Sequence, residues 1–120
     1  MIVLAEDDRA ARAGYAELLA SIGYDVVEAE TGVELVDRVR ERLPDAVLTD
    51  IALPELDGFH AAAVLKSDPR TRDIPIIGMT GHWSSDVGER GTAAGLAALL
   101  MKPCCPEHLT AELERVLTIP

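Results

Sequence analysis

Residues 45–58 read DAVLTDIALPELDG, and the apolar run at their start leads directly into the carboxylate of Asp50. A short apolar run bounded by turn residues is typical of a strand that is buried on both faces of a parallel sheet. An aspartate at the end of such a strand can cap the following turn, because Asp side chains accept hydrogen bonds from nearby backbone N–H groups. A chemical role for Asp50 therefore requires partner residues from other parts of the chain.

Apolar runs of the same kind recur along the chain and alternate with amphipathic helical patterns. The runs lie at residues 2–5, 46–48, 76–79 and 97–101, and the more polar run 24–28 is expected at an edge of the sheet. Between the runs, apolar residues recur at intervals of three and four, which is the spacing of one helix face. This alternation predicts an α/β fold, a doubly wound (βα)5 sheet of five parallel strands with right-handed crossovers.

The fourth predicted helix, residues 83–94, has the weakest pattern of the five. It contains Gly88 and Gly91, and a glycine in a helix interior costs about 1 kcal/mol relative to alanine. We therefore expect this helix to be short, irregular or mobile. Other helix starts are better marked, since residues 31–34 match a capping box and Pro106 suits the first turn of a helix.

Composition limits the class of protein. A chain of 120 residues with 48% hydrophobic and 27% charged residues predicts a single globular domain, 1–120. No apolar stretch reaches the roughly 18 residues of a membrane span, and no signal peptide is visible, so we expect a cytoplasmic protein without direct membrane contact. The net charge of -10 argues against direct nucleic-acid binding, which needs clustered Lys and Arg. The two cysteines, Cys104 and Cys105, are adjacent and match no metal-binding spacing.

Polar residues follow the central apolar runs, at the points where the predicted strands end. These residues are Glu6, Asp7, Asp8, Asp50, Thr80 and Lys102. In doubly wound sheets, ligands bind beyond the carboxyl ends of the strands, so these side chains converge if the first and third strands are neighbours. The role of Asp8 stays open here, because it can cap the following helix as readily as bind a metal ion.

The chemistry of this set favours phosphoryl transfer. Clustered carboxylates repel one another unless a cation offsets them, and oxygen ligands select a hard ion such as Mg2+, with Mn2+ as an alternative. Lys102 can pair with Asp50 or with an incoming anion, and Thr80 supplies a hydroxyl donor. Such a site suits a reaction in which catalysis is mostly positioning and charge neutralisation. Asp50 is then the nucleophile, since aspartate carboxylates form aspartyl-phosphates.

Four segments, VLAEDD, LTDIALPELDG, PIIGMTG and LLMKP, resemble the signature segments of the receiver domains of two-component response regulators. The resemblance covers essentially the whole chain and implies a flavodoxin-like, CheY-like sheet with strand order 2-1-3-4-5. It also implies that Asp50 accepts a phosphoryl group from a sensor histidine kinase, a histidine phosphotransfer domain or a small phosphodonor. Such a domain is a phosphoacceptor in a phosphorelay rather than an enzyme, apart from self-catalysed phosphotransfer and dephosphorylation.

The resemblance assigns the metal ligands. It implies that Asp7 and Asp50 bind Mg2+ directly and that Glu6 acts through a water molecule. The backbone carbonyl of Ala52 completes the protein's share of the coordination.

The resemblance also assigns the phosphoryl contacts and the switch. Thr80 and Lys102 would each bind a phosphoryl oxygen, and the peptide bond before Pro103 is cis in the family. The phosphoryl group would draw Thr80 and its loop inward. The fourth helix, fifth strand and fifth helix would then shift toward a state that binds a downstream effector protein or domain.

Several residues depart from the family pattern or stand at its variable positions. Leu99 occupies a switch position that is usually aromatic, so an aromatic rotamer flip coupled to Thr80 is impossible here. Ala52 and His82 flank the site, and Ala52 cannot position a water molecule through its side chain. Trp83, the single tryptophan, falls on the expected output surface, where it either packs against its own loop or contacts a partner.

Two other functions stay open. A pseudo-receiver that binds partners without being phosphorylated has Leu99 as its support. A Mg2+-dependent phosphohydrolase is disfavoured, because Ala52 stands where such enzymes place a second aspartate. The sequence does not reveal the kinase, the signal, the output or the oligomeric state. The chain is either free-standing or part of a longer protein such as a hybrid histidine kinase, whose receivers residues 79–109 resemble more than those of transcription factors.

Overall fold

The computed structural model describes residues 1–117, and residues 118–120 lie outside the described part. A parallel sheet of five strands forms its centre, in the order β2-β1-β3-β4-β5. The strands are β1 (Ile2–Ala5), β2 (Val26–Ala29), β3 (Ala46–Asp50), β4 (Ile76–Thr80) and β5 (Ala98–Met101). The predicted doubly wound fold and its strand order are therefore confirmed, and β2 lies at an edge as expected.

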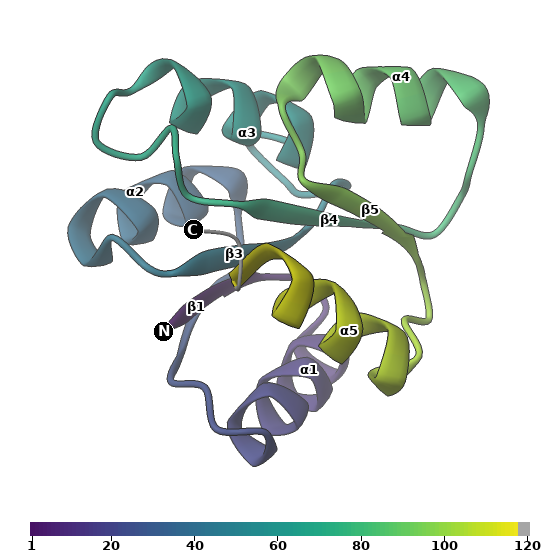
Figure 1. The fold of residues 1–120 in the computed structure, drawn as a ribbon. Helices are drawn as coiled ribbons and strands as arrows, with labels where there is room; N and C mark the ends of the chain where they lie inside the picture. The colour runs from purple at the N-terminus through teal and green to yellow at the C-terminus, as the bar shows by residue number, and fades with distance from the viewer. Residues whose placement is uncertain (118–120) are drawn as a thin grey trace.

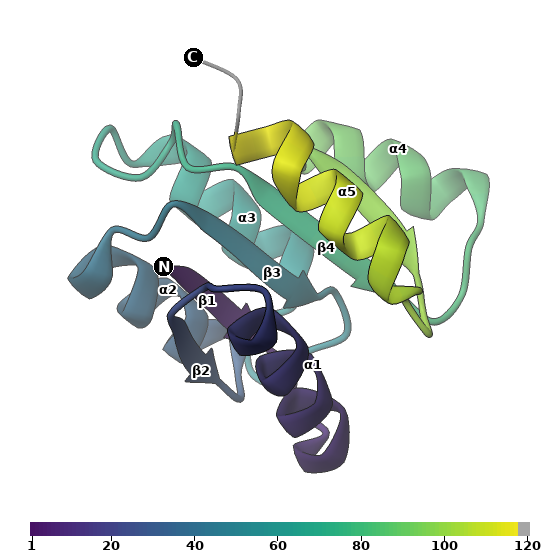
Figure 2. The ribbon, with the colours of Figure 1, turned by 60° about the horizontal axis from the view of Figure 1, so that its bottom comes forward.

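Five helices alternate with the strands and cover both faces of the sheet. They are α1 (Arg9–Ser21), α2 (Gly32–Arg42), α3 (Gly58–Ser67), α4 (Ser85–Ala94) and α5 (Pro106–Leu117). Figures 1 and 2 show α1 and α5 together on one face of the sheet and α2, α3 and α4 on the other. Within residues 1–117, no helix is both long enough and apolar enough to cross a membrane.

A separate apolar cluster fills each face of the sheet. Val47 of β3 packs in the cluster under α2, α3 and α4, with Leu35 of α2. Leu48, the next residue of β3, packs in the cluster under α1 and α5, with Leu19 of α1. Neighbouring side chains of a strand point to opposite faces, so a strand covered on both faces needs apolar residues at every position.

The place of the functional residues follows from the pairing of β1 with β3. Ala5 lies opposite Thr49 in the parallel register of these strands. The next residues along the two strands, Glu6 and Asp50, therefore emerge side by side at the carboxyl edge of the sheet. This edge is where doubly wound folds leave a crevice for ligands, at the point where the winding reverses.

The regularity of α4 differs from the expectation. It is a continuous helix of ten residues, the same length as α3. The side chain of Ser84 caps its first turn by accepting a hydrogen bond from the Val87 amide, and Gly95 ends it in the left-handed conformation. The Trp83 ring packs so closely on Gly88 that a Cβ there would lie 3.1 Å from the indole Cζ2. The expectation of a short helix is met, since α3 and α4 are the shortest helices of the described residues. The alternative of an irregular helix was wrong, because caps and packing outweigh the low propensity of glycine.

Candidate functional site

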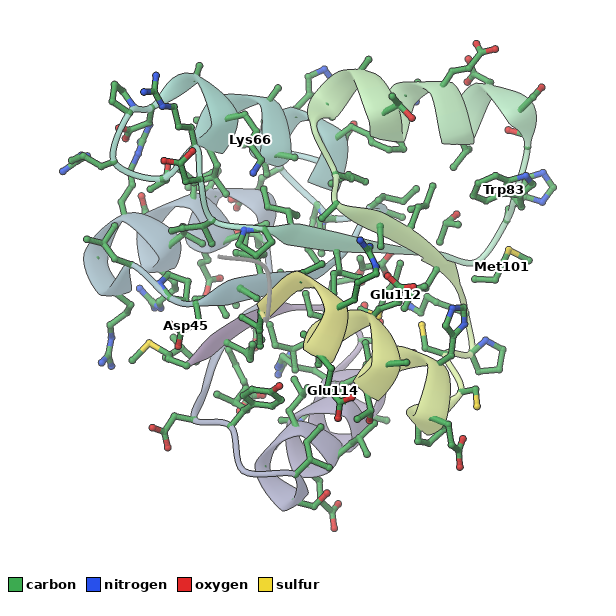
Figure 3. The ribbon with its side chains drawn as sticks, in the orientation of Figure 1. Asp45, Lys66, Trp83, Met101, Glu112 and Glu114 are labelled. Atoms are coloured by element: carbon green, nitrogen blue, oxygen red, sulfur yellow. The ribbon has the colours of Figure 1, made fainter. Side chains whose placement is uncertain are left out.

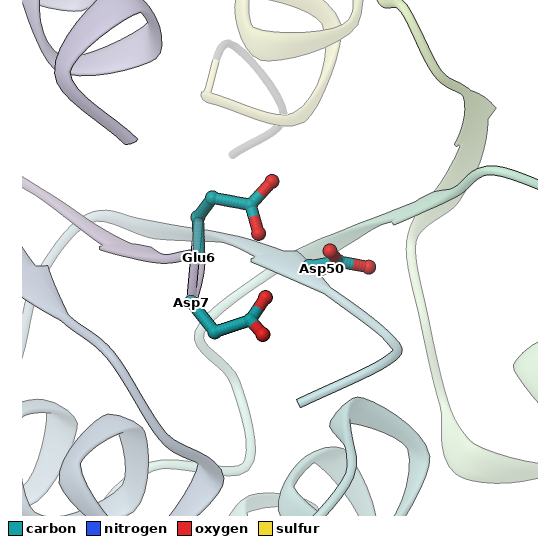
Figure 4. Close-up of side chains that lie close together, drawn as sticks. All are labelled: Glu6, Asp7 and Asp50. Carbon is teal, nitrogen blue, oxygen red and sulfur yellow. The ribbon is translucent and has the colours of Figure 1, made fainter. Parts of the chain in front are cut away.

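Asp50 ends β3 with its side chain at the carboxyl edge of the sheet (Figure 4). The residue is only 5% exposed. Its Oδ1 atom accepts a hydrogen bond from the Ala52 amide at 3.1 Å, and its Oδ2 atom accepts one from the Lys102 ammonium at 3.0 Å. Each carboxylate oxygen can accept more than one hydrogen bond, so both keep capacity for a further partner. Asp50 is therefore a restrained carboxylate. Its bond from the Ala52 amide caps the turn that follows β3, and its bond from Lys102 adds a partner that capping does not require.

Glu6 and Asp7 bring two more carboxylates to the same place from the end of β1 (Figure 4). Glu6 is fully buried, whereas Asp7 is exposed. One carboxylate oxygen of each of Glu6, Asp7 and Asp50 lies within 4.8 Å of the other two. Three oxygen ligands at this separation from one another fit a hard divalent cation.

Lys102 supplies a positive charge to the three acids. Its ammonium lies 2.5 Å from Glu6 Oε1 and 3.0 Å from Asp50 Oδ2. The residue follows β5, and its amide still donates a hydrogen bond to the carbonyl of Thr80 at 2.7 Å. The next peptide bond, to Pro103, is cis, as the family resemblance implies. The sequence indicated a pairing with Asp50, but it did not reveal the closer contact with Glu6.

Burial and charge have opposite effects on the pKa values of Glu6 and Lys102. Burial raises the pKa of the Glu6 carboxyl above its usual value, although the hydrogen bond from Lys102 opposes the rise. Burial also works to lower the pKa of the Lys102 ammonium, but its hydrogen bonds to Glu6 and Asp50 more than offset this and leave that pKa raised. Lys102 is therefore charged at neutral pH, and it is the main group that favours ionised Glu6.

Thr80 ends β4 near the site, but its hydroxyl faces its own loop. The hydroxyl donates a hydrogen bond to the carbonyl of His82 at 2.9 Å, and it lies 3.2 Å from the His82 amide, which donates to it. Its side chain therefore stands apart from the group formed by Glu6, Asp7, Asp50 and Lys102. Thr80 also lines a hollow, together with Ala52, Gly81 and His82 among others.

The remaining acids of the strand ends act as helix caps. Asp8 accepts a hydrogen bond from the Ala11 amide at 2.8 Å at the start of α1. Of the two roles that the sequence left open for Asp8, helix cap or metal ligand, this geometry favours the cap. Asp57 accepts one from the His60 amide at 2.9 Å at the start of α3. A glycine is needed at position 58, because the backbone there passes so close to β3 that a Cβ would lie 2.7 Å from the Asp50 carbonyl oxygen.

Two residues expected to carry the output, Leu99 and Trp83, lie in β5 and in the loop before α4. Leu99 is partly buried and packs against the cluster under α2, α3 and α4. Trp83 is 51% exposed and lies in the loop before α4 (Figure 3). It lines a hollow together with Gly88 and Leu99. Trp83 thus packs against its own helix while leaving half of its surface free.

Residues 2–114 match the family model of the response regulator receiver domain. The chain belongs to this family. The match includes all five strands and each of the predicted site residues.

Curated relatives differ in how much of their length the receiver occupies. A gliding motility regulatory protein of Myxococcus xanthus is 38% identical over 101 residues, which are 84% of this chain and 13% of that protein. The polar-differentiation response regulator DivK of Brucella ovis is 32% identical over 102 residues, 85% of this chain and 83% of the relative. The receiver therefore spans a small part of the first relative and most of the second.

Solved structures show the same fold over nearly the whole chain. The receiver domain of a sensor histidine kinase from Pseudomonas aeruginosa, with a magnesium ion coordinated in its active-site cleft, has a TM-score of 0.92 and 30% identity. That match covers 98% of this chain and 97% of the other. The chemotaxis protein CheY4 of Vibrio cholerae has a TM-score of 0.91 and 27% identity, with 97% of each chain covered.

Proposed function

We propose that this receiver domain, residues 1–120, is a phosphorylation-dependent signalling module whose acceptor is Asp50. The donor is the phosphohistidine of a sensor histidine kinase or a phosphotransfer domain, and a small phosphodonor can replace it. A carboxylate oxygen of Asp50 forms a bond to phosphorus as the bond from phosphorus to the histidine nitrogen breaks. The imidazole keeps the electron pair of the broken bond, and Asp50 becomes an aspartyl-phosphate.

The observation that carries this proposal is the pairing of Asp50 with Lys102 beside two further acids. Lys102 lies 3.0 Å from the acceptor carboxylate, where it can follow an incoming phosphoryl oxygen. Phosphoryl transfer needs little covalent chemistry from the protein beyond the nucleophile, so positioning and charge neutralisation supply most of the rate. An arrangement built only for stability would not need Asp7, an exposed carboxylate within 4.8 Å of the buried pair.

The donor set fits Mg2+. Glu6, Asp7 and Asp50 offer oxygen atoms only, and their three negative charges exceed the single charge of Lys102. A bound Mg2+ would neutralise charge that develops on the phosphoryl oxygens. We propose Asp7 and Asp50 as direct ligands, with Glu6 acting through water and Ala52 through its carbonyl. The magnesium ion in the cleft of the Pseudomonas aeruginosa relative supports this assignment.

The switch would begin with Thr80. Its hydroxyl has to leave the backbone of His82 before it can donate to a phosphoryl oxygen. That movement would carry the loop before α4, and with it Trp83, toward Asp50. We propose that the surface formed by α4, β5 and α5 reports this change to an effector. Because Leu99 replaces an aromatic residue, the signal would run through the loop and α4 rather than through a ring at that position.

We further propose that the domain works in the cytoplasm, either free-standing or within a longer protein. Two of the similar structures are receiver domains of histidine kinases, which supports the hybrid-kinase type. The chain spans only 13% of the Myxococcus xanthus relative, so a longer parent protein has a precedent.

Intact-protein mass spectrometry tests the proposal. The protein is incubated with acetyl phosphate or phosphoramidate, with Mg2+ or with EDTA. We expect one phosphoryl adduct that requires Mg2+, is absent from Asp50→Asn and persists in Asp37→Asn, a control at an exposed position of α2. An adduct in Asp50→Asn would move the acceptor elsewhere. No adduct with either donor, in a protein that binds Mg2+, would favour the pseudo-receiver, for which Leu99 is the supporting residue.

A further inference from the structure

Arg12 of α1 joins the acidic turn of the site to the end of β2. Its Nη1 atom donates a hydrogen bond to the backbone carbonyl of Glu6 at 3.0 Å. The rest of the guanidinium pairs with Glu28 through Nε and with Glu30 through Nη2, each at 3.1 Å. Its side chain is only 12% exposed, although both glutamate partners are at the surface.

The turn that Arg12 contacts carries the proposed metal ligands. The amide of Glu6 is held by the Ala29 carbonyl at 3.1 Å, and its carbonyl is held by Arg12. On the other side, Asp8 is fixed as the cap of α1. Asp7 lies between these two anchored residues. The backbone of the turn therefore sets the direction in which the Asp7 side chain leaves the chain.

The contribution of Arg12 is geometric rather than electrostatic. Its positive charge lies against two carboxylates of its own, Glu28 and Glu30, so it adds little net charge to the site. An arginine suits this place because its planar fork can donate to three acceptors at once, whereas a lysine ammonium is a point charge on a flexible stem. Groups that orient metal ligands in this way commonly change metal affinity by 10- to 100-fold when they are removed.

We propose that Arg12 is a positioning residue that holds the turn of Glu6 and Asp7 in the geometry required for Mg2+. This inference rests on the proposed function only in naming the cation. It assigns to Arg12 and its two glutamate partners a role in tuning the site from outside the group of ligands.

The test compares the Mg2+ affinity of Arg12→Met with that of the wild type, measured by isothermal titration calorimetry. We expect about tenfold weaker binding in the variant, because Asp7 loses its fixed direction. A purely electrostatic role predicts the opposite change, since removal of a positive charge near three acids strengthens cation binding. Unchanged or tighter binding in a folded Arg12→Met protein would therefore overturn the proposal.

Two control variants distinguish a positioning role of Arg12 from an effect of its charge. Arg38→Met makes the same charge change on α2, where Arg38 pairs with Glu41, and should leave Mg2+ affinity unchanged. Arg12→Lys keeps the charge but not the fork, and we expect an affinity between those of Arg12→Met and the wild type. If Arg12→Met fails to fold in urea titrations, Arg12→Lys carries the test, and wild-type affinity in that variant would count against the proposal.

A second readout needs no metal ion. Hydrogen exchange of the amides of Glu6 and Asp8, measured by NMR in EDTA, should speed up by about tenfold in Arg12→Met. Amides of β4 should exchange at the wild-type rate. If the wild type itself binds no Mg2+, the proposed function fails while this exchange result still decides whether Arg12 holds the turn. Unchanged exchange at Glu6 and Asp8 would overturn the positioning role independently of metal binding.

Discussion

Lys102 supplies the positive charge that pairs with the buried carboxylate of Glu6. Glu6 is fully buried and its carboxylate accepts a hydrogen bond from the Lys102 ammonium. Removing one partner of a buried ion pair leaves an uncompensated charge, which costs more than the pair itself contributes. The same lysine contacts Asp50, so that the proposed acceptor shares this positive charge with the buried Glu6.

Replacement of Lys102 by methionine should make folding stability strongly dependent on pH. In Mg2+-free buffer at pH 8, we expect Lys102→Met to lower the free energy of unfolding by about 3 kcal/mol, because Glu6 stays buried without a partner. Its already raised pKa rises further in the folded variant, so the folded state binds a proton that the unfolded state does not. The deficit should therefore shrink as the pH falls toward 5, which urea unfolding at both pH values measures.

The double variant Glu6→Gln with Lys102→Met isolates this pair. It removes both charges, and we expect it to recover much of the lost stability at pH 8 and to lose the steep dependence on pH. A single Lys102→Met variant whose deficit is the same at pH 8 and pH 5 would contradict the account, since the cost would then come from lost packing.

For Asp57 we expect folding stability to depend on pH with the opposite sign. Burial works to raise its pKa, but hydrogen bonds from the backbone and side chain of His60, with the nearby charge of Arg90, lower it below its usual value. A lowered folded-state pKa gives stability that is present above the unfolded pKa of about 3.9 and is lost as the pH falls through the folded value. Asp57→Asn keeps a capping side chain but loses the charge.

We therefore expect Asp57→Asn to be less stable than the wild type by about 0.5 kcal/mol at pH 6, a small value because the side chain is partly exposed. The difference should shrink progressively as the pH falls below about 3.9. Chemical denaturation across this range measures it, with Asp37→Asn as an exposed control on α2. A difference that stays constant down to pH 3 would assign the effect to lost hydrogen-bond geometry rather than to charge.

At the scale of the elements, the sequence predicts the strands better than the helices. Each central strand is covered on both faces, so its residues form a continuous apolar run that is visible without any structure. The expected run 24–28 is shifted relative to β2 (Val26–Ala29), because most residues of this edge strand are not fully buried and its apolar pattern is weak. The irregularity expected for α4 was wrong, since helix propensity does not include the Trp83 ring that packs on Gly88.

For the site, the sequence predicts which residues lie together better than it predicts how their side chains are oriented. Strand order brings Glu6, Asp50 and Lys102 to one edge of the sheet. The doubly wound fold and its ligand-binding edge follow from the apolar runs, whereas the order of the strands was implied by the family resemblance. The direction of the Thr80 hydroxyl toward His82 does not, because it depends on a local turn. The contact of Arg12 with the Glu6 carbonyl also escapes the sequence, since its acceptor is backbone.

Gly88 provides a test of the packing on α4. Alanine in place of a helical glycine normally stabilises a helix by about 1 kcal/mol. At Gly88 a Cβ would lie 3.1 Å from Trp83 Cζ2 and 3.2 Å from Cη2, so the ring must move. We expect Gly88→Ala to gain little stability and to shift the emission of Trp83, the single tryptophan, to longer wavelength as the indole becomes more exposed.

Gly14 of α1 is the matched control for this substitution, since a Cβ there meets none of the described atoms within 4 Å. Gly14→Ala should gain the usual increment of about 1 kcal/mol without a change in emission. In a Trp83→Leu background, Gly88→Ala should recover part of that gain. If Gly88→Ala stabilises the wild type as much as Gly14→Ala does, the ring does not constrain α4.

The whole molecule carries a net charge of -10, and the proposed metal site concentrates part of it at one edge of the sheet. Repulsion within Glu6, Asp7 and Asp50 favours the unfolded state as long as no cation is bound. A ligand that binds only the folded state stabilises it by an amount set by its concentration relative to Kd. Mg2+ should therefore affect folding stability through this site and not only through general screening.

We expect Asp7→Asn to be more stable than the wild type without Mg2+ and less stable than the wild type with it. In EDTA we expect the variant to be more stable than the wild type, by about 0.5 kcal/mol, because one of three clustered charges is removed. At a Mg2+ concentration of 100 Kd, the wild type should gain about 2.7 kcal/mol and become the more stable protein. Urea unfolding in matched ionic strength of NaCl separates screening from binding. An equal gain in both proteins would mean that Mg2+ acts on the net charge of the chain and that Asp7 does not bind it.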